Sequence, residues 1–355
     1  MSMNQPIYSK IAGCLIAGAL GDALGYPIEF QPWSLIKVKY GPSGLDHPVL
    51  TDGKAIISDD TQMTLFTNEG MILGHQARQN STANAGKTVE EYIWQAYLCW
   101  LKTQHVYWVD RSLTSIWENE SELLSLPEMN EARAPGNTCL AALDSGKMGT
   151  ILKRINQSKG CGGVMRTAPC GFTKEWGEPL ETGAAAAAIT HGHAGGWAPG
   201  GILSDLVCRL IYGKQQPLET TFLESLDAAR RTWDDKELPA SLKIMEKAIE
   251  LSHTDLPEIA AVHTIGGGWV GDEALAIAFY ACLKHENSLP EALLCAVNHS
   301  GDSDSTGAIA GNIMGALYGL EAIPADWMEV LELRDTILDQ ARKAYETAAG
   351  NNPTA

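Results

Sequence analysis

Residues 301–316 read Gly-Asp-Ser-Asp-Ser-Thr-Gly-Ala-Ile-Ala-Gly-Asn-Ile-Met-Gly-Ala. After residue 305 this segment consists of small and apolar residues, which predicts a helix that other helices approach closely. Two carboxylates, those of Asp302 and Asp304, stand at the start of that helix. Because a carboxylate at the end of a buried element needs a compensating cation, the segment predicts a packed helical core with a charged site at its edge.

Helical periodicity continues through most of the chain. Ala-rich and Leu-rich segments are common, whereas alternating runs of β-branched and aromatic residues are rare, so the predicted fold class is all-α. We expect one domain over residues 8–348 and a frayed tail over residues 349–355, because no stretch between the informative motifs reads as a linker. The segments with helical spacing include residues 10–22, 61–75, 89–102, 181–190, 201–212, 242–251, 272–284, 289–298 and 305–320.

Two stretches read as less regular than their neighbours. Residues 102–137 are rich in Trp, Glu and Pro, and residues 215–243 are strongly charged. We interpret both as lid or rim insertions around a helical body.

The composition argues against several classes of protein. The 355 residues are 45% hydrophobic and carry a formal net charge of -17, so an extended contact with nucleic acid is unfavourable. The 8 cysteines include no CxxC pair and no cluster at zinc-finger spacing. No signal peptide is recognisable, and the apolar runs are too short for a membrane span. These features predict a cytoplasmic protein without a membrane partner. The sequence does not determine the oligomeric state, for which a monomer is favoured.

A second acidic cluster, Ser58, Asp59 and Asp60, directly precedes an amphipathic segment. Helix capping would explain such residues in a cluster taken by itself, and this alternative stays open. Four aspartates converging on one pocket would repel each other and raise their own pKa values, so the two clusters together favour a hard divalent cation. An EF-hand is excluded, because Ile313 stands where that calcium loop requires a bidentate Glu.

Residues 13–25 (GCLIAGALGDALG), 58–61 (SDDT) and 301–311 (GDSDSTGAIAG), taken as a set, resemble the motifs of the ADP-ribosylglycohydrolase family. That family includes dinitrogenase reductase-activating glycohydrolases and ADP-ribosyl-arginine hydrolases. The matching segments run from about residue 11 to residue 319 in the family's order. The resemblance implies a compact orthogonal helical bundle with two Mg²⁺ ions, or Mn²⁺ in their place, which hold the ribose hydroxyls and an attacking water.

The same resemblance implies which residues bind the cations and which are catalytic. Serine stands at two positions where the family more often has Thr, a mild departure because its hydroxyl can still coordinate. The implied metal ligands are Ser58, Asp59, Asp60, Asp302, Asp304 and Ser305. The implied catalytic residues are Asp304, which orients or deprotonates the water, Glu29, which gates the site or assists proton transfer, and Asp60. Solvated surface is the alternative reading of Glu29.

The resemblance also implies contacts with the substrate. The glycine loop at residues 160–163 would cradle a diphosphate through its backbone amides, although Cys161 stands near the position of the usual Asn. The segment at residues 190–197 would hold the adenosine end, with a tryptophan stacking on the base. A simple turn and a core tryptophan are the respective alternatives. The implied substrate-binding residues are Gly160, Gly162, Gly163, Met165, His191, Trp197, Gly267 and Gly268.

The function that the resemblance implies is hydrolysis of the N-glycosidic bond of a mono-ADP-ribosylated protein, with release of ADP-ribose. Arginine is the favoured linkage, but serine-linked, nucleobase-linked and O-acetyl-ADP-ribose substrates remain open because variable loops decide between them. A dinuclear-metal nucleotide phosphohydrolase and an immunity-type binding protein are the alternatives from other classes. AMP as a product would indicate the phosphohydrolase. The intact set of aspartates argues against a binding protein without catalytic activity.

Overall fold

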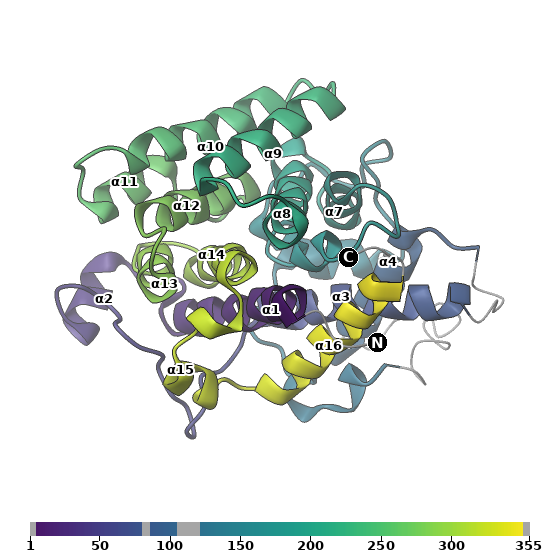
Figure 1. The fold of residues 1–355 in the computed structure, drawn as a ribbon, viewed down its shortest axis with the longest axis horizontal. Helices are drawn as coiled ribbons and strands as arrows, with labels where there is room; N and C mark the ends of the chain where they lie inside the picture. The colour runs from purple at the N-terminus through teal and green to yellow at the C-terminus, as the bar shows by residue number, and fades with distance from the viewer. Residues whose placement is uncertain (1–4, 80–85, 105–120, 351–355) are drawn as a thin grey trace.

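The computed structural model describes residues 5–79, 86–104 and 121–350. In these residues the chain forms α-helices, short 3₁₀ turns and isolated bridges but no strand, which confirms the all-α prediction (Figure 1). Each predicted helical segment named above falls on a helix. The α-helices are α1 (Gln5–Gly25), α2 (Trp33–Tyr40), α3 (Asp59–Gln79), α4 (Val89–Thr103), α6 (Asn137–Asp144), α7 (Pro179–Ala188), α8 (Ala194–Tyr212), α9 (Leu218–Thr232), α10 (Leu238–Ser252), α11 (Glu258–Ile265), α12 (Gly271–Lys284), α13 (Leu289–Val297), α14 (Ser303–Tyr318), α15 (Ala325–Val330) and α16 (Arg334–Gly350). The 3₁₀ turns are η1 (Tyr26–Ile28), η2 (Leu123–Ser125), η3 (Pro127–Met129), η4 (Cys161–Gly163), η5 (Ala168–Gly171) and η6 (Leu320–Ala322).

Helices α1 and α14 pack against each other at the centre of the molecule (Figure 1). A Cβ placed on Gly311 of α14 would lie 2.0 Å from the carbonyl oxygen of Ala17, and one placed on Gly25 would lie 2.2 Å from that of Ser303. The two backbones approach this closely only because these positions lack side chains. As the sequence predicted, α14 is a closely approached helix, and its first turn lies beside the last turn of α1.

Contrary to the expectation that the apolar runs are too short for a membrane span, α1 could cross a membrane by length and composition, and among the described residues it is the one helix that could. However, 89% of its apolar window is buried inside the protein. It packs against α14 and α16, and its buried side chains belong to one continuous apolar cluster that extends through the molecule. This is the packing of a core helix.

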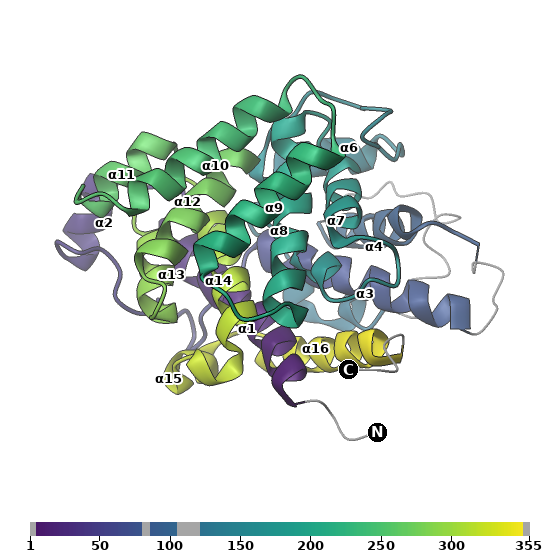
Figure 2. The same ribbon diagram turned by 45° about the horizontal axis from the view of Figure 1, so that its top comes forward.

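The prediction of an irregular insertion at residues 215–243 is wrong. These residues form α9 and the start of α10, which lie against α8 and α12 on one side of the molecule (Figure 2). Phe222 of α9 stacks on Phe279 of α12 with the ring centroids 3.9 Å apart. The charged residues occupy the outer faces of amphipathic helices. The stretch contains many of them because these faces are exposed to solvent, and not because the backbone is irregular.

The other predicted insertion is irregular where the structure describes it. Residues 121–136 contain only the turns η2 and η3. The buried carboxylate of Glu69 on α3 anchors this segment by accepting hydrogen bonds from the Ser121 hydroxyl (2.5 Å) and the Glu122 backbone N–H (3.1 Å). Burial raises the pKa of Glu69 to about 7. Residues 105–120 of the predicted lid and residues 351–355 of the predicted tail lie outside the described residues.

Candidate active site

Two helix starts meet at the candidate active site. Helix α3 begins with Asp59 and Asp60, whereas α14 follows Asp302 and carries Asp304 in its first turn. All four side chains are at most 5% exposed. Backbone N–H groups at a helix start favour nearby anions, and that of Ser305 donates to Asp304 Oδ1 over 2.9 Å. The structure therefore brings together the two acidic clusters, which are more than 200 residues apart in the sequence.

The two serines predicted as ligands lie in the same place. The Ser58 hydroxyl is fully buried, accepts a hydrogen bond from the Asp60 backbone N–H over 3.2 Å and lies within hydrogen-bonding reach of Asp304. Ser305, in the first turn of α14, is 2% exposed. Hydroxyl and carboxylate oxygens are thus mixed in one buried cluster.

Sequence reasoning assigned no role to Asp22, which belongs to this site. Its carboxylate at the end of α1 accepts hydrogen bonds from the backbone N–H groups of Ser58 and Thr61, all at 3.0 Å, and from the Thr61 hydroxyl. Asp22 therefore fixes the start of α3. The available signal was an aspartate in an otherwise apolar helix, between Gly21 and Ala23.

Glu29 joins the aspartates, as predicted, from the turn that follows η1. One oxygen each of Glu29, Asp302 and Asp304 lies within 4.8 Å of the other two. Burial, reinforced by the charge of Asp304, raises the pKa of Glu29 to about 10 and that of Asp22 to about 7. The same causes raise the pKa values of Asp59 and Asp60 well above the usual range. The ionised carboxylates of the site therefore repel one another.

The donor set fits a divalent cation. Asp60 Oδ2 and Glu29 Oε2 are buried without a hydrogen-bond partner. Among the described residues no Lys or Arg forms an ion pair with any of the clustered carboxylates. Buried carboxylates need a compensating charge, and oxygen donors of this kind suit Mg²⁺ or Mn²⁺.

The glycine loop at residues 160–163 borders the acidic cluster. The Cys161 thiol donates to Asp302 Oδ2 over 2.7 Å, and its backbone N–H donates to the carbonyl of Trp269 over 3.2 Å. Gly160 also pairs with Val270 in an isolated bridge. The loop thus lies beside the carboxylates, and the Cys161 side chain faces Asp302.

Two residues predicted to hold the adenosine end are buried. His191 is 1% exposed, bonds with the Thr190 hydroxyl over 2.8 Å and lies against Gly160, where a Cβ would be 3.0 Å from its Nε2. Burial lowers the pKa of His191 to about 3. The fully buried Trp197 meets Trp233 edge-on with the ring centroids 4.9 Å apart. The predicted stacking of Trp197 on a base does not fit this position, because a stacking ring needs an open face.

Met165 is likewise 1% exposed, and its carbonyl accepts a hydrogen bond from the Thr64 hydroxyl over 3.2 Å. Its backbone N–H donates to the Cys161 carbonyl over 3.2 Å. In this structure Met165 therefore connects the glycine loop to α3 through its backbone, and its side chain lies in the core.

The loop at residues 266–268 supports Asp302 from the other side. The Gly267 carbonyl accepts a hydrogen bond from the Asp302 backbone N–H over 2.9 Å. Glu273, in the first turn of α12, accepts from the backbone N–H groups of Gly267 (2.9 Å) and Gly268 (3.2 Å). Gly268 has a φ of +78°, and a Cβ there would lie 2.9 Å from the Thr306 side chain. The two glycines thus lie beside the carboxylates, and their predicted contact with the substrate stays a prediction.

Two aromatic side chains that sequence reasoning did not select form an exposed pair beside the site. Phe30 follows Glu29 directly and stacks on Trp269 with the ring centroids 5.2 Å apart. The two residues are 67% and 42% exposed. Phe30 has a φ of +64°, a conformation that non-glycine residues rarely adopt. This pair forms an aromatic rim next to the acidic cluster.

A cleft of about 410 Å³ lies between α6 and the segment that leads to the glycine loop. Its wall includes Thr138 and Ala141 of α6 together with Ser158. The Ser158 hydroxyl accepts a hydrogen bond from the Gly160 backbone N–H over 3.2 Å, so the cleft borders the loop directly. Its volume is in the range of cavities that hold small molecules.

This arrangement can be compared with known proteins. The sequence model of the family described as ADP-ribosylglycohydrolase matches residues 3–354. The chain belongs to the ADP-ribosylglycohydrolase family. The predicted resemblance is thereby confirmed, and this glycohydrolase is an enzyme that hydrolyses ADP-ribose glycosidic bonds.

Relatives match this glycohydrolase over nearly its whole length. ADP-ribosylhydrolase ARH3 of Gallus gallus is 23% identical over 381 residues, which cover 98% of this chain and 95% of the relative. ADP-ribosyl-(dinitrogen reductase) glycohydrolase of Rhodospirillum rubrum is 24% identical over 334 residues, which cover 92% of each chain. A solved structure, called an ADP-ribosylglycohydrolase-related protein complex, has a TM-score of 0.60 and 21% identity over 97% of this chain and 99% of its own. The match to this solved structure shows the fold.

Proposed function

We propose that this glycohydrolase removes ADP-ribose from the arginine side chains of mono-ADP-ribosylated proteins by cleaving the N-glycosidic bond. The observation that supports this most directly is the convergence of Glu29, Asp302 and Asp304 within 4.8 Å at the start of the buried helix α14. The name of the Rhodospirillum rubrum relative specifies an ADP-ribosylated protein as its substrate.

The metal ligands in this proposal are Ser58, Asp59, Asp60, Asp302, Asp304 and Ser305. When bound there, two Mg²⁺ ions, or Mn²⁺ in their place, would hold the 2″ and 3″ hydroxyls of the distal ribose and lower the pKa of the attacking water. The unpartnered oxygen of Asp60 and the raised pKa values of the aspartates support a cation at this place.

The remaining chemistry belongs to the chain itself. Asp304 orients the water and accepts its proton as the water attacks C1″ of the ribose. The surrounding carboxylates stabilise the positive charge that develops on the ribose. Glu29 lies within 4.8 Å of Asp302 and Asp304, and its carboxyl group passes a proton to the departing nitrogen.

The ADP part of the substrate lies, in our proposal, along the glycine loop and in the cleft beside α6. Backbone amides of residues 160–163 would contact the diphosphate. The cleft wall at Thr138, Ala141 and Ser158 continues directly from that loop. This placement replaces the predicted stacking on the buried Trp197.

Two features favour a guanidinium leaving group. The aromatic rim of Phe30 and Trp269 offers exposed ring faces next to Glu29. A planar cation stacks favourably on such rings, and nearby carboxylates attract its charge. Arginine therefore suits this side of the site better than an uncharged linkage does.

The test measures ADP-ribose release from an arginine-ADP-ribosylated protein with Mg²⁺, with a chelator, and in the Asp304→Asn variant. We expect metal-dependent release and a decrease in kcat of about a hundredfold or more in the variant, because a positioned acid or base contributes about that much. Asp326→Asn is the matched control, since Asp326 is an exposed aspartate in the first turn of α15.

Other outcomes identify the alternatives. Release from serine-linked or nucleobase-linked ADP-ribose, or from O-acetyl-ADP-ribose, without release from arginine would overturn the linkage. AMP in place of ADP-ribose would indicate phosphoanhydride cleavage. A folded, metal-loaded protein that binds an ADP-ribosylated partner but releases nothing would favour the immunity-type binding protein.

A further inference from the structure

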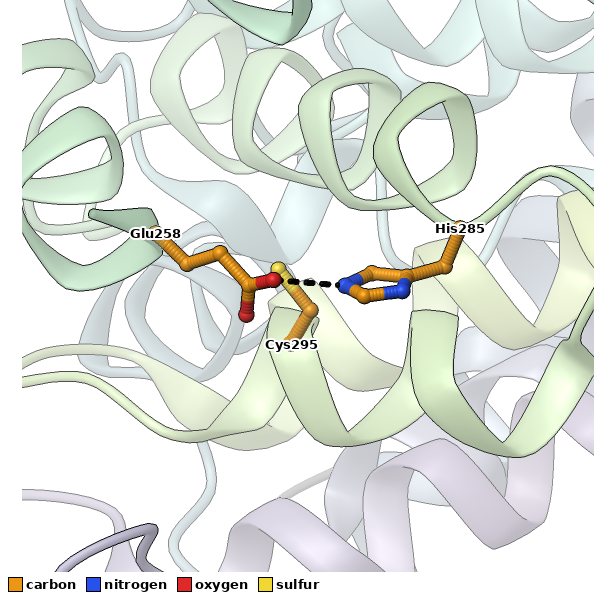
Figure 3. Close-up of side chains that lie close together, drawn as sticks. All are labelled: Glu258, His285 and Cys295. Atoms are coloured by element: carbon orange, nitrogen blue, oxygen red, sulfur yellow. Dashed lines mark hydrogen bonds and ion pairs between the residues drawn. The ribbon is translucent and has the colours of Figure 1, made fainter. Parts of the chain in front are cut away.

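Outside the active site, three side chains of three chemical kinds converge from different helices. Glu258 opens α11, His285 follows the last residue of α12, and Cys295 lies in α13 (Figure 3). One carboxylate oxygen, one ring nitrogen and the thiol sulfur all lie within 4.8 Å of one another. His285 Nε2 is 2.9 Å from Glu258 Oε1. Each helix thus contributes one potential metal ligand to the same point.

We propose that Glu258, His285 and Cys295 form a binding site for a zinc-class transition-metal ion, separate from the catalytic centre. A sulfur, a nitrogen and an oxygen donor together suit Zn²⁺, which takes four ligands in a tetrahedron. Three protein ligands leave the fourth position for a water molecule. The all-oxygen set at the active site suits a different class of ion, so the two sites need not compete.

The surroundings of His285 support this assignment. Its second ring nitrogen, Nδ1, faces the carboxylate of Glu291 at 3.6 Å. A histidine that binds a metal through one nitrogen commonly donates the N–H of the other to a carboxylate, which fixes the tautomer and strengthens the ligand. Glu291, in the first turn of α13, occupies that position. It is a positioning residue in this proposal.

An unpartnered polar atom adds an independent observation. The hydroxyl of Tyr280 on α12 is buried without a hydrogen-bond partner. It is close enough to Cys295 and Glu258 for their charges to raise its pKa, although burial is the larger cause. A buried hydroxyl without a partner is uncommon in a folded protein. A water molecule on the metal would supply the missing partner.

The metal-free cluster holds its sulfur as a thiol. Burial, followed by the charge of Glu258, raises the pKa of Cys295 well above the usual range. Cys295 is therefore a poor nucleophile in this state. Metal binding replaces the S–H bond with a sulfur–metal bond and releases one proton to the solvent, with no change of oxidation state.

A metal ion bound by these three residues would link the helices that support one half of the active site. Helix α11 leads into the loop at residues 266–268, the first turn of α12 carries the glutamate that accepts from that loop, and α13 leads to Asp302. His285 is 21% and Glu258 44% exposed, so an ion can reach the site from the solvent. A bound ion would thus stabilise the scaffold of the catalytic loops without touching the substrate.

The test uses Co²⁺ as a probe, because a cobalt–thiolate bond gives a charge-transfer absorption that oxygen ligands do not give. The full chain is stripped with a chelator, kept reduced with a phosphine, saturated with Mg²⁺ and titrated with Co²⁺. We expect one equivalent of Co²⁺ to produce the band and Zn²⁺ to remove it. The Cys295→Ser variant loses the band, whereas Cys161→Ser, which removes the thiol next to Asp302, retains it.

Two further variants keep the proposal falsifiable if Cys295→Ser fails to fold. His285→Gln, at a partly exposed position, should lose most of the affinity for Zn²⁺, and Glu291→Gln should lower that affinity by about ten- to a hundredfold. The proposal is wrong if the wild-type protein gives no thiolate band, if the band disappears in Cys161→Ser while Cys295→Ser retains it, or if neither His285→Gln nor Glu291→Gln changes the affinity. Catalytic activity is not the readout, so these results stand apart from the proposed function.

Discussion

Asp22 shows how a single buried side chain organises the catalytic centre. It lies on α1 but makes its hydrogen bonds with Ser58 and Thr61 at the start of α3. Burial and the charge of Asp304 on α14 both raise the pKa of Asp22. The protonation of Asp22 therefore depends on α14 as well as on α3. Asp22 thus couples the two acidic clusters without being one of the predicted ligands.

The Asp22→Asn variant should test this positioning role. An amide retains the size of the side chain but places an N–H₂ group where Oδ1 accepts from the Ser58 backbone N–H, which costs about 1–3 kcal/mol for the lost hydrogen bond. We expect a lower melting temperature and a Mg²⁺ requirement raised by about tenfold, with kcat largely restored at high Mg²⁺. Asp326→Asn provides the control. A kcat that stays low at every Mg²⁺ concentration would mean that Asp22 acts in the chemical step itself.

The cleft beside α6 gives a second prediction at this scale. Replacing the exposed Ala141 by Trp should fill the cleft and raise KM for the ADP-ribosylated substrate by about tenfold or more, while kcat changes little, because the cleft lies apart from the carboxylates. Ala141→Ser is the matched control and should leave KM unchanged. The measurement is the steady-state KM of both variants. Equal KM values would show that the ADP part of the substrate does not bind in the cleft.

At the scale of elements, the position of the site follows from the contact between α1 and α14. Their close approach at Gly25 and Gly311 sets the first turn of α14 against the end of α1. This contact brings the carboxylates of Asp302 and Asp304 toward those of α3, and the Gly267 carbonyl holds the Asp302 backbone in place. Helix packing, and not the local sequence at either cluster, therefore determines the geometry of the centre.

Gly311→Ala should weaken this contact. The added methyl group would lie 2.0 Å from the carbonyl oxygen of Ala17, so the helices must separate. We expect a loss of about 1–3 kcal/mol in the free energy of unfolding, the usual cost of overpacking, together with weaker Mg²⁺ binding as Asp304 shifts. Gly86→Ala is the control, because no atom lies within 4 Å of a Cβ at that position. Denaturant unfolding measures both, and equal stabilities would show that the contact is not tight in solution.

Much of the helical framework could be predicted from the sequence, because apolar spacing reports the buried face of each helix. The two acidic clusters could also be predicted, since their motifs are local. Asp22, Phe30 and Trp269 could not, because their roles arise from contacts between distant segments. The predicted stacking of Trp197 on a base does not fit for the same reason, because the sequence neighbours of Trp197 do not reveal that Trp233 covers its ring.

At the scale of the whole molecule, the acidic centre makes stability depend on pH and on metal. The folded-state pKa of Asp22, about 7, lies above the value of 3.8 for an ordinary aspartate. A carboxyl group with a raised pKa stabilises the fold while it is protonated, fully below the unfolded pKa, and this contribution is lost as the pH rises through the folded pKa. The metal-free protein should therefore become less stable between about pH 4 and pH 7.

Mg²⁺ should reverse this loss. Cation binding competes with protons for the same oxygens, so its stabilising effect grows as the pH rises. We expect the difference in melting temperature between Mg²⁺-loaded and chelator-treated protein to be larger at about pH 8 than at about pH 5. Asp304→Asn should show a smaller difference at the higher pH. A difference that is independent of pH would mean that the carboxylates are already ionised without metal.

The pairing of α1 with α14 also has a consequence for synthesis on the ribosome. The two helices that form the central pair lie near opposite ends of the described chain. A nascent chain therefore lacks the main partner of the apolar α1 until α14 has been translated, and contacts between such distant segments form slowly. The catalytic centre cannot assemble before Asp302 and Asp304 have been translated, because they follow every other carboxylate of the cluster in the sequence.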